Sequence, residues 1–474
     1  MIGNLVSIKF QRLKYVVSDL ISTMFGFVIF NIVRYSILGI SGSQIPLIDY
    51  LCTPILVIEQ IFVPLIVLCV FWLSGYYNHP FDKSRLDELS TTILSSIFNT
   101  IWIYLALLIN DQIYGHAKGY ELVIVLFLCL FTFTYICRLL ITMHATKHFA
   151  DMRWGFNTIM VGDSDNAMRT ADRLLKSQKK LGYNIIAHIP IEGEKSSALP
   201  HTTIDRKKLE NMCRSGHVDQ IILDMESPSE DKLLKMLYTL LPLNVPIRLA
   251  PTSISLLSNK IRLNDVYAEP FVDITSPAVT EFTKNLKRTI DVTVSALALL
   301  MLMPVMAVFA IAVKRSSPGP VFYSQERVGI HQKIFKIYKF RSMREDAEST
   351  GPQLSDDNDP RVTPIGHIMR KYRIDELPQF WNILKGDMSL VGPRPEREYY
   401  IRQLVAIIPY YTLLHQVRPG LTSWGMVKYG YARTVDEMVK RAQFDIIYLS
   451  NMSISMDVKI MLHTINTVIS GKGV

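Results

Sequence analysis

Cysteine is scarce in this chain, with five residues among 474. Four of them lie in apolar runs, no pair has the C-x-x-C spacing, and the sequence contains no cluster of cysteine and histidine. A disulfide scaffold and a cysteine-based zinc site are therefore excluded. Reduced thiols buried among apolar side chains are the simplest interpretation.

Charged residues are also few, at 20%, whereas hydrophobic residues make up 49% of the chain. This composition excludes an intrinsically disordered chain and argues against a wholly soluble enzyme. Most of the net charge of +9 lies in residues 281–474, which contain 26 Lys+Arg against 18 Asp+Glu. Such a basic domain is suited to anionic headgroups or phosphorylated substrates. Nucleic acid is the competing partner, but no zinc-finger, RRM, KH or helix-turn-helix signature is present, so we expect none.

Long apolar runs dominate residues 1–150. Four are long enough to cross about 30 Å of hydrocarbon as helices: Tyr15–Leu38, Leu51–Trp72, Thr91–Ile109 and Tyr120–Ile141. Lys and Arg residues cluster outside the first, between the second and third, and after the fourth run. The positive-inside rule therefore places both ends of a four-helix bundle in the cytoplasm. The charged residues Asp19, Arg34, Glu59 and Arg138 inside the runs either mark a polar pathway or face another helix.

Residues 151–280 show a different pattern, in which strand-like and helix-like runs alternate. The predicted strands are Asn157–Val161, Tyr183–Ile189, Gln220–Met225 and Pro246–Ala250. The predicted helices are Asn166–Ser177, Asp205–Ser215 and Glu230–Leu240. This alternation predicts a Rossmann-like α/β domain with a small parallel sheet. Ser164 replaces the second glycine of the dinucleotide fingerprint, so we expect a regulatory or structural domain, followed by a connector over Pro251–Lys284.

A fifth apolar run, Val292–Val313, has basic residues on both flanks and Pro304 near its middle. Both flanks satisfy the positive-inside rule only if they stay on one side of the membrane. Proline removes a helix hydrogen bond and bends the helix. We therefore predict a re-entrant helix, about 285–314, that breaks at Pro304. An ordinary kinked spanning helix is the alternative.

The densest group of charges lies around Asp375 and Glu376. Arg370 and Arg373 precede them, and Pro378 suits the start of a short helix. Three further cations follow or precede this segment in the chain: Lys339, Arg341 and Arg394. Carboxylates beside several cations are typical of phosphoryl transfer, where one carboxylate attacks, another holds Mg2+, and Arg and Lys clamp the phosphate. From spacing alone, a simple helix-capping role for the two acids is equally open.

From Lys287 to the C-terminus, the sequence resembles the bacterial polyprenyl-phosphate sugar-1-phosphate transferases that prime polysaccharide synthesis. The matching segments are Lys287–Asp291, Ser317–Pro320, Gln325–Gly329, Tyr338–Met343, Asp359–Thr363, Asp375–Gln379, Leu384–Pro395 and Arg418–Thr422. The preceding membrane and Rossmann-like parts resemble the long form of the family, which includes galactose- and glucose-phosphate transferases. One departure is Ser423–Met426, where the family often reads Gly-Trp-Ala-Gln, and this leaves the donor sugar open.

The resemblance implies a membrane enzyme that transfers a sugar-1-phosphate from a UDP-sugar, with galactose or glucose expected, to undecaprenyl phosphate. Asp375 would attack the sugar-bearing phosphorus and release UMP, and Glu376 would ligate Mg2+. Phosphate groups would be held by Arg370, Arg394, Lys339, Arg341, Arg288 and Asp291. For Asp291, pairing with Lys287 at a helix end is equally open. The product would start an exopolysaccharide, O-antigen or capsule.

The predicted architecture has three parts. A four-helix transmembrane bundle covers 1–150, the Rossmann-like α/β domain and connector cover 151–280, and a monotopic α+β transferase domain covers 281–474. The resemblance places the chain in the bacterial inner membrane with the transferase domain on the cytoplasmic face, and we expect a homodimer. The competing functions are a non-catalytic membrane scaffold or nucleotide sensor, and a flippase, which the large soluble portion disfavours.

Overall fold

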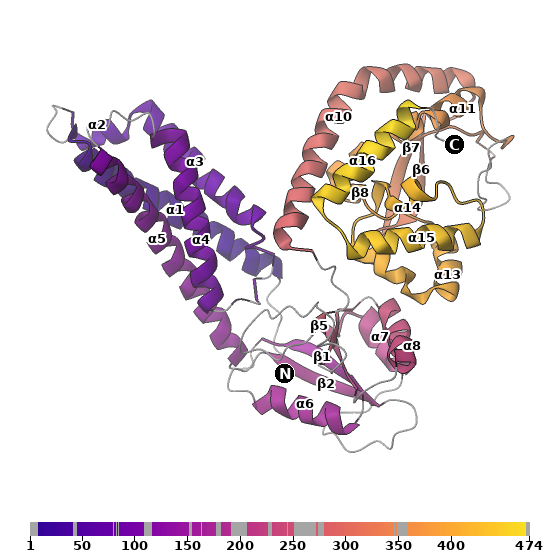
Figure 1. Cartoon of the computed structure of the whole chain (residues 1–474), viewed down its shortest axis with the longest axis horizontal. Coiled ribbons are helices and arrows are strands. Elements are labelled where there is room, and N and C mark those ends of the chain that lie inside the picture. The colour runs from indigo at the N-terminus through magenta and orange to yellow at the C-terminus, as the bar shows by residue number, and fades with distance from the viewer. Residues whose placement is uncertain are drawn as a thin grey trace. The chain divides into compact units, whose positions relative to one another are not determined.

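The computed structural model describes residues 8–470 apart from several short stretches. These stretches are 41–44, 109–115, 151–153, 177–181, 191–205, 226–229, 251–271, 274–278, 348–358 and the single positions 79, 82, 84, 163, 244 and 346. The chain forms two compact units (Figure 1). One comprises Met1–Asn157, Arg169–Asn184 and Leu263–Glu269, and the other comprises Thr158–Met168, Ile185–Arg262 and Pro270–Val474.

The N-terminal part is a bundle of long helices, as the apolar runs predict. Its elements are α1 (Ile8–Ile37), α2 (Leu47–Leu51), α3 (Pro54–Leu73), α4 (Arg85–Ile103), which continues into the π-helical turn η2 (Tyr104–Leu108), and α5 (His116–Ala150). Helix α1 packs on α3 and α5, and α4 packs on α5. Buried aromatic and aliphatic side chains such as Phe27, Phe30 and Leu126 fill the interior. Five described helices, these four long ones and α10 below, are long and apolar enough to cross a membrane.

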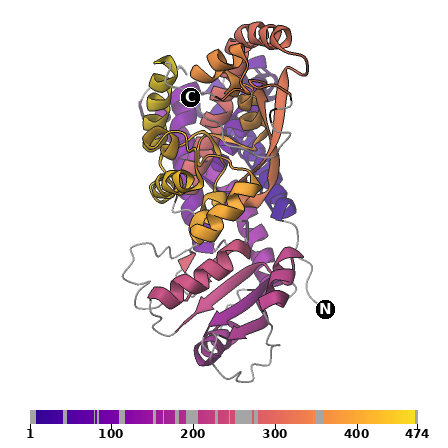
Figure 2. The same cartoon turned by 90° about the vertical axis from the view of Figure 1, so that its right-hand side faces the viewer.

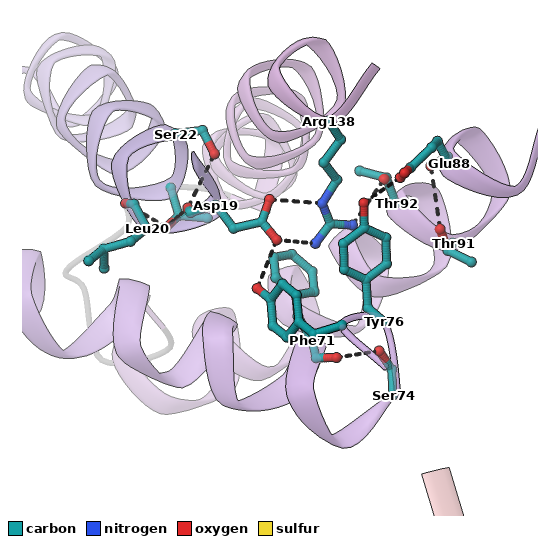
Figure 3. A network of polar contacts seen from close by, with 12 residues as sticks. Asp19, Leu20, Ser22, Phe71, Ser74, Tyr76, Glu88, Thr91, Thr92 and Arg138 are labelled. Atoms are coloured by element: carbon teal, nitrogen blue, oxygen red, sulfur yellow. Dashed lines mark hydrogen bonds and ion pairs between the residues drawn. The ribbon is translucent and has the colours of Figure 1, made fainter. Parts of the chain in front are cut away.

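The charged residues inside the bundle pair with one another. The Arg138 guanidinium donates to both carboxylate oxygens of Asp19, at 2.9 and 2.6 Å (Figure 3). Tyr77 donates to Asp19 at 2.8 Å. A second pair joins Arg34 to Glu59 at 3.4 Å. Charges in an apolar bundle are tolerated when such partners neutralise them. Of the two interpretations left open by the sequence, the structure supports contact between helices.

The α/β part confirms every strand and helix that the sequence predicts there. Its elements are β1 (Phe156–Gly162), α6 (Ser164–Lys176), β2 (Tyr183–Pro190), α7 (Arg206–Arg214), β3 (Gln220–Asp224), α8 (Glu230–Leu240), η3 (Leu241–Leu243), β4 (Ile247–Leu249) and β5 (Val272–Asp273). The sheet order is β2-β1-β3-β4-β5. The pairs β1–β3 and β3–β4 are parallel, whereas β5 joins β4 in the antiparallel sense. Helix α6 lies on one side of the sheet and α7 and α8 on the other (Figure 2).

Two details refine the predictions for this part. Strand β5 lies inside the segment predicted as a connector, most of which falls outside the described residues. Gly162 follows the predicted first strand because β1 and β3 approach closely there. A Cβ atom at Gly162 would lie 1.6 Å from the Asp224 carbonyl oxygen. This glycine is therefore needed for strand packing.

The C-terminal part begins with α10 (Glu281–Ser316), which runs through Pro304, so the break predicted at this proline is not found. The helix bends strongly along its length (Figure 1), and an internal proline is the usual cause of such a bend. The elements that follow are β6 (Phe322–Val328), η4 (Ile330–Gln332), β7 (Ile334–Phe340), α11 (Pro364–Lys371), η5 (Ile374–Glu376), α12 (Gln379–Lys385), β8 (Ser389–Val391), α13 (Glu398–Ile407), η6 (Pro409–Gln416), β9 (Gly420–Thr422), α14 (Trp424–Lys428), α15 (Val435–Ser450) and α16 (Ile454–Ile469).

Short sheets and surrounding helices make this part an α+β domain, as predicted. Strands β6 and β7 form an antiparallel hairpin, and β8 pairs with β9 in parallel. Apolar side chains from β7, α12, β8, α15 and α16 share one core. Polar contacts attach the helices to it. Lys287 of α10 pairs with Asp457 of α16 at 2.6 Å, and the Tyr448 hydroxyl donates to the same carboxylate.

Candidate active site

The candidate site lies where η5 and α12 meet β7. The fully buried Asn382 of α12 accepts a hydrogen bond from the Tyr338 backbone N–H at 3.1 Å and donates to the Lys336 carbonyl at 2.7 Å. Its side-chain amide therefore attaches α12 to β7. As a result Lys339, the next residue on β7, reaches Glu376 of η5 with its Nζ 3.0 Å from Oε1. Two segments that are distant in sequence thus form one charged cluster.

Glu376 is surrounded by cations. Besides Lys339, Arg394 approaches its Oε1 at 3.6 Å, and Arg373 approaches its Oε2 at 3.3 Å. Burial would raise the pKa of this carboxyl, but the three cations outweigh burial and hold the pKa well below its usual range. Glu376 therefore stays ionised and carries a full negative charge in the protein interior.

Asp375 lies next to it in a very different state. Burial is the main cause that raises the pKa of its carboxyl, to about 6, and the neighbouring Glu376 charge adds to the rise, while Lys339, Arg370 and Arg373 oppose it. Within the described part of the chain, no residue donates a hydrogen bond to the Asp375 carboxylate. Two adjacent carboxyls whose pKa values move in opposite directions are typical of sites where each has a separate chemical role.

Arg394 is held by its neighbours as well as by the flanking prolines. Its backbone N–H points at Asp445, 3.5 Å from Oδ2, and the other oxygen of Asp445 accepts a hydrogen bond from Gly425 at 2.8 Å. Glu396, two residues on, accepts hydrogen bonds from Arg327 and Arg441. The segment that carries the Arg394 guanidinium is thus fixed by buried charges on both sides.

The structure brings together five of the predicted site residues and shows other partners for three. Asp375, Glu376, Lys339, Arg370 and Arg394 interact with one another. Arg341 instead donates to the carbonyls of Ser317 and Pro318 at the end of α10.

Arg288 donates to the carbonyls of Ile383 and Leu384 at the end of α12. Asp291 accepts from the Ser389 hydroxyl at 2.7 Å and the Leu390 N–H at 3.0 Å. Pairing of Asp291 with Lys287 is not the arrangement found, because Lys287 pairs with Asp457. These contacts join α10 to the rest of the domain, and phosphate binding by Arg288, Asp291 and Arg341 stays a prediction.

Two residues of the cluster had no assigned role from the sequence. Arg373 has φ 54° and ψ 27°, a left-handed conformation that is uncommon for residues other than glycine. The Tyr431 ring lies 5.1 Å from the Arg373 guanidinium and 5.2 Å from that of Arg394. The position of Arg373 inside the charged segment was a usable signal, whereas Tyr431 lies outside the family motifs named above.

The donor set suits a magnesium ion only together with a substrate. Mg2+ commonly takes one or two carboxylates, several waters and substrate phosphates. Asp375 and Glu376 supply two buried, adjacent carboxylates of this kind. No group of three or more His, Cys, Asp or Glu side chains that could enclose a metal occurs among the described residues. The residues therefore fit a metal that arrives with phosphate groups.

Comparison with known proteins adds the family. A family model described as bacterial sugar transferase matches residues 282–471, which include all the site residues above. A second model, described as a CoA-binding domain, matches residues 73–251.

Curated relatives agree with the first of these models. The chain is 31% identical over 318 residues to a UDP-glucose:undecaprenyl-phosphate glucose-1-phosphate transferase of Escherichia coli K12, covering 66% of this chain and 68% of that protein. It is 45% identical over 188 residues to a UDP-N-acetylgalactosamine-undecaprenyl-phosphate N-acetylgalactosaminephosphotransferase of Aeromonas hydrophila, covering 40% of this chain and 44% of that protein.

A shorter relative matches a segment of this chain about as long as the C-terminal domain. A sugar transferase of Bacillus subtilis is 40% identical over 194 residues, which are 40% of this chain and 90% of that protein. The chain thus spans less than half of the Aeromonas relative and about two thirds of the Escherichia relative. Together with the cluster of cations and carboxylates, these matches show that the chain belongs to the bacterial sugar transferase family.

Proposed function

We propose that this protein transfers a sugar-1-phosphate from a UDP-sugar to undecaprenyl phosphate. The products are UMP and an undecaprenyl-diphosphate sugar, which would begin a surface polysaccharide such as an exopolysaccharide, O-antigen or capsule. The names of the relatives support the reaction class. The observation that carries the mechanism is the buried Asp375 carboxyl, whose pKa is raised to about 6 in a cluster of cations.

Asp375 is the proposed nucleophile. One of its carboxylate oxygens forms a bond to the sugar-bearing phosphorus, and the bond from that phosphorus to UMP breaks. An oxygen of undecaprenyl phosphate then attacks the same phosphorus and releases the Asp375 carboxylate. A carboxylate with a pKa of about 6 is still ionised at neutral pH and is more basic than an ordinary aspartate. Because no described residue donates to it, its lone pairs are available for attack.

The surrounding cations supply the electrostatic stabilisation. Lys339, Arg370 and Arg394 are placed to hold the diphosphate of the donor or the phosphate of the lipid, since guanidinium and ammonium groups bind phosphate oxygens strongly. Glu376 orients Lys339 and Arg394 through its ion pairs. Glu376 would also hold Mg2+, which when bound neutralises charge on phosphate oxygens.

The membrane arrangement is part of the proposal. We place α1, α3, α4 and α5 across the bacterial inner membrane and α10 as a re-entrant helix that returns to the cytoplasmic face. The apolar segment of α10 is only 6% buried within the protein, so it needs an apolar environment outside it. Its bend and its basic flanks favour entry and exit on one side. We also propose that the protein is a homodimer.

Purified full-length protein in lipid nanodiscs with undecaprenyl phosphate and Mg2+ tests the reaction. A panel of UDP-sugars, including glucose, galactose and their N-acetylated forms, should give UMP release with one preferred donor. We expect donor labelled with 32P to leave a covalent label that maps to Asp375. Product formation by an Asp375→Asn variant, or turnover without any label on the protein, would contradict the assigned nucleophile.

A further inference from the structure

We infer that Tyr431 is a positioning residue whose ring holds the guanidinium groups of Arg373 and Arg394 against Glu376. The inference rests on the proposed function, because it assigns a role in the same site. The family motifs named above do not include this tyrosine.

The Tyr431 ring is shared by the two guanidiniums that pair with Glu376. Their distances to the ring centroid are 5.1 Å for Arg373 and 5.2 Å for Arg394, both within the range of a cation–π contact. The same two groups lie 3.3 and 3.6 Å from the two oxygens of Glu376. Each guanidinium therefore contacts both the aromatic ring and the carboxylate.

Arg373 depends on the ring more than most arginines do. Its Nε atom is buried and has no hydrogen-bond partner, so hydrogen bonds alone leave the guanidinium incompletely satisfied. A buried cation that lacks such partners gains more from an aromatic face than an exposed one does, because water does not compete. The Tyr431 ring compensates for the missing partner.

The backbone of Arg373 supports a specific purpose for its side chain. A left-handed backbone conformation is unfavourable for a residue with a Cβ atom, whereas glycine adopts it freely. Arg373 nevertheless has a φ of 54° in the turn before η5, although its side chain is large and charged. Strained residues of this kind concentrate at functional sites.

The position of Tyr431 is itself well defined. Gly430, which precedes it, has φ 89°, and a Cβ atom at Gly430 would meet no atom within 4 Å. Glycine is therefore required there by the backbone conformation of the turn and not by a close contact. Ala432, directly after it, is buried in the core with Met438. The turn and this anchor present the ring to the two arginines.

The consequence for the reaction follows from the charges. With both guanidiniums fixed, Glu376 is neutralised by its own partners and the Asp375 carboxylate is left free to attack. Without the ring, the two long side chains regain rotamer freedom, which disfavours any single arrangement around the phosphates. We therefore expect the rate of the chemical step to fall while the protein stays folded.

Pre-steady-state formation of the Asp375 adduct tests this role. The variant Tyr431→Leu should lower the rate constant of the UMP burst about tenfold or more, while the burst amplitude stays near one per active site. Tyr431→Phe keeps the ring and should stay within about threefold of the wild-type rate. Tyr429→Leu, a matched change two residues away, should leave the burst unchanged. A burst that loses amplitude but keeps its rate constant would show a merely structural role.

A double-mutant cycle with Arg373→Ala makes the test specific. If Tyr431 acts through Arg373, the loss from Tyr431→Leu should be much smaller in the Arg373→Ala background than in the wild type. Equal losses in both backgrounds, or a Tyr431→Phe variant as slow as Tyr431→Leu, would overturn the inference. A wild-type protein that released no UMP from any UDP-sugar would instead contradict the proposed function, so the two failures are distinguishable.

Discussion

Two buried clusters of charge, one in the helical bundle and one in the transferase domain, differ in how completely their carboxylates are paired. In the bundle, both oxygens of Asp19 accept hydrogen bonds from Arg138 (Figure 3), and one of them also accepts from Tyr77. In the transferase domain, Glu376 is paired on both oxygens in the same way, but Asp375 beside it has no donor among the described residues. Complete pairing indicates a structural role, and the unpaired carboxylate indicates where chemistry occurs.

The balance of charge also differs between the clusters. The bundle cluster has two cations and two anions, namely Arg138, Lys83, Asp19 and Glu88. The transferase cluster has four cations and two anions, namely Lys339, Arg370, Arg373, Arg394, Asp375 and Glu376. A balanced cluster needs no further partner, whereas an excess of two positive charges suits an added phosphate group. We therefore expect the same Asp→Asn substitution to lower activity in the transferase cluster and stability in the bundle cluster.

The largest effect is expected for Asp375→Asn. Loss of the nucleophile should lower UMP release by about a thousandfold or more. Folding should not suffer, because the substitution removes a charge whose burial is unfavourable and is not offset by a donor. Thermal unfolding in detergent should therefore show a melting temperature equal to or above that of the wild type. A large fall in melting temperature would contradict the distinction between the clusters.

The same change at Asp19 should act on stability. Asp19→Asn leaves the Arg138 guanidinium buried without its counter-charge, and breaking a buried pair in this way costs about 3–5 kcal/mol. We expect a lower melting temperature and a lower yield of membrane-inserted protein. UMP release per folded molecule should be close to wild type. A strong loss of activity in the folded fraction would show that the bundle takes part in the reaction.

Activity and stability should depend on pH in opposite ways, because both depend on the charge of the Asp375 carboxyl. Because burial raises the pKa of Asp375 to about 6, its nucleophilic form is lost as the pH falls through 6, and kcat/KM should drop about tenfold per pH unit below that point. For stability the sign is opposite, since a raised pKa favours folding at low pH and disfavours it above about 6. Asp375→Asn should therefore gain stability over the wild type at pH 7.5 and lose that advantage below pH 4. If the acid limb of the wild type had its midpoint far from pH 6, the titration would belong to another group. Loss of the limb on substitution of another site acid would identify that group.

Much of the fold could be predicted from the sequence because apolar periodicity defines each long element. The strands from β1 to β4 and the helices from α6 to α8 were predicted to within about two residues. Strand β5 was missed because two residues, Val272–Asp273, carry no alternation. For the site, the pair Asp375 and Glu376 follows from the motif and its charges. The partners of Arg288 and Arg341 do not, because a guanidinium binds a carbonyl at a helix end as readily as a phosphate, and only the fold decides between them.

The smallest predicted effect comes from comparing Arg341, which contacts backbone carbonyls, with Arg370, which we expect to bind phosphate. Arg341 donates to the carbonyls of Ser317 and Pro318, so Arg341→Gln should lower the melting temperature, with KM for the UDP-sugar changed by no more than about twofold. Arg370, which lowers the pKa of Asp375 and donates to Ser342 at 3.1 Å, should act mainly on KM, because Arg370→Gln removes a phosphate partner and should raise KM about tenfold. Steady-state kinetics and thermal unfolding of both variants separate the two roles. If Arg341→Gln raised KM as strongly as Arg370→Gln, the carbonyl contacts at the end of α10 would have to open when substrate binds, and contacts with backbone carbonyls would no longer distinguish a structural arginine from a phosphate-binding one.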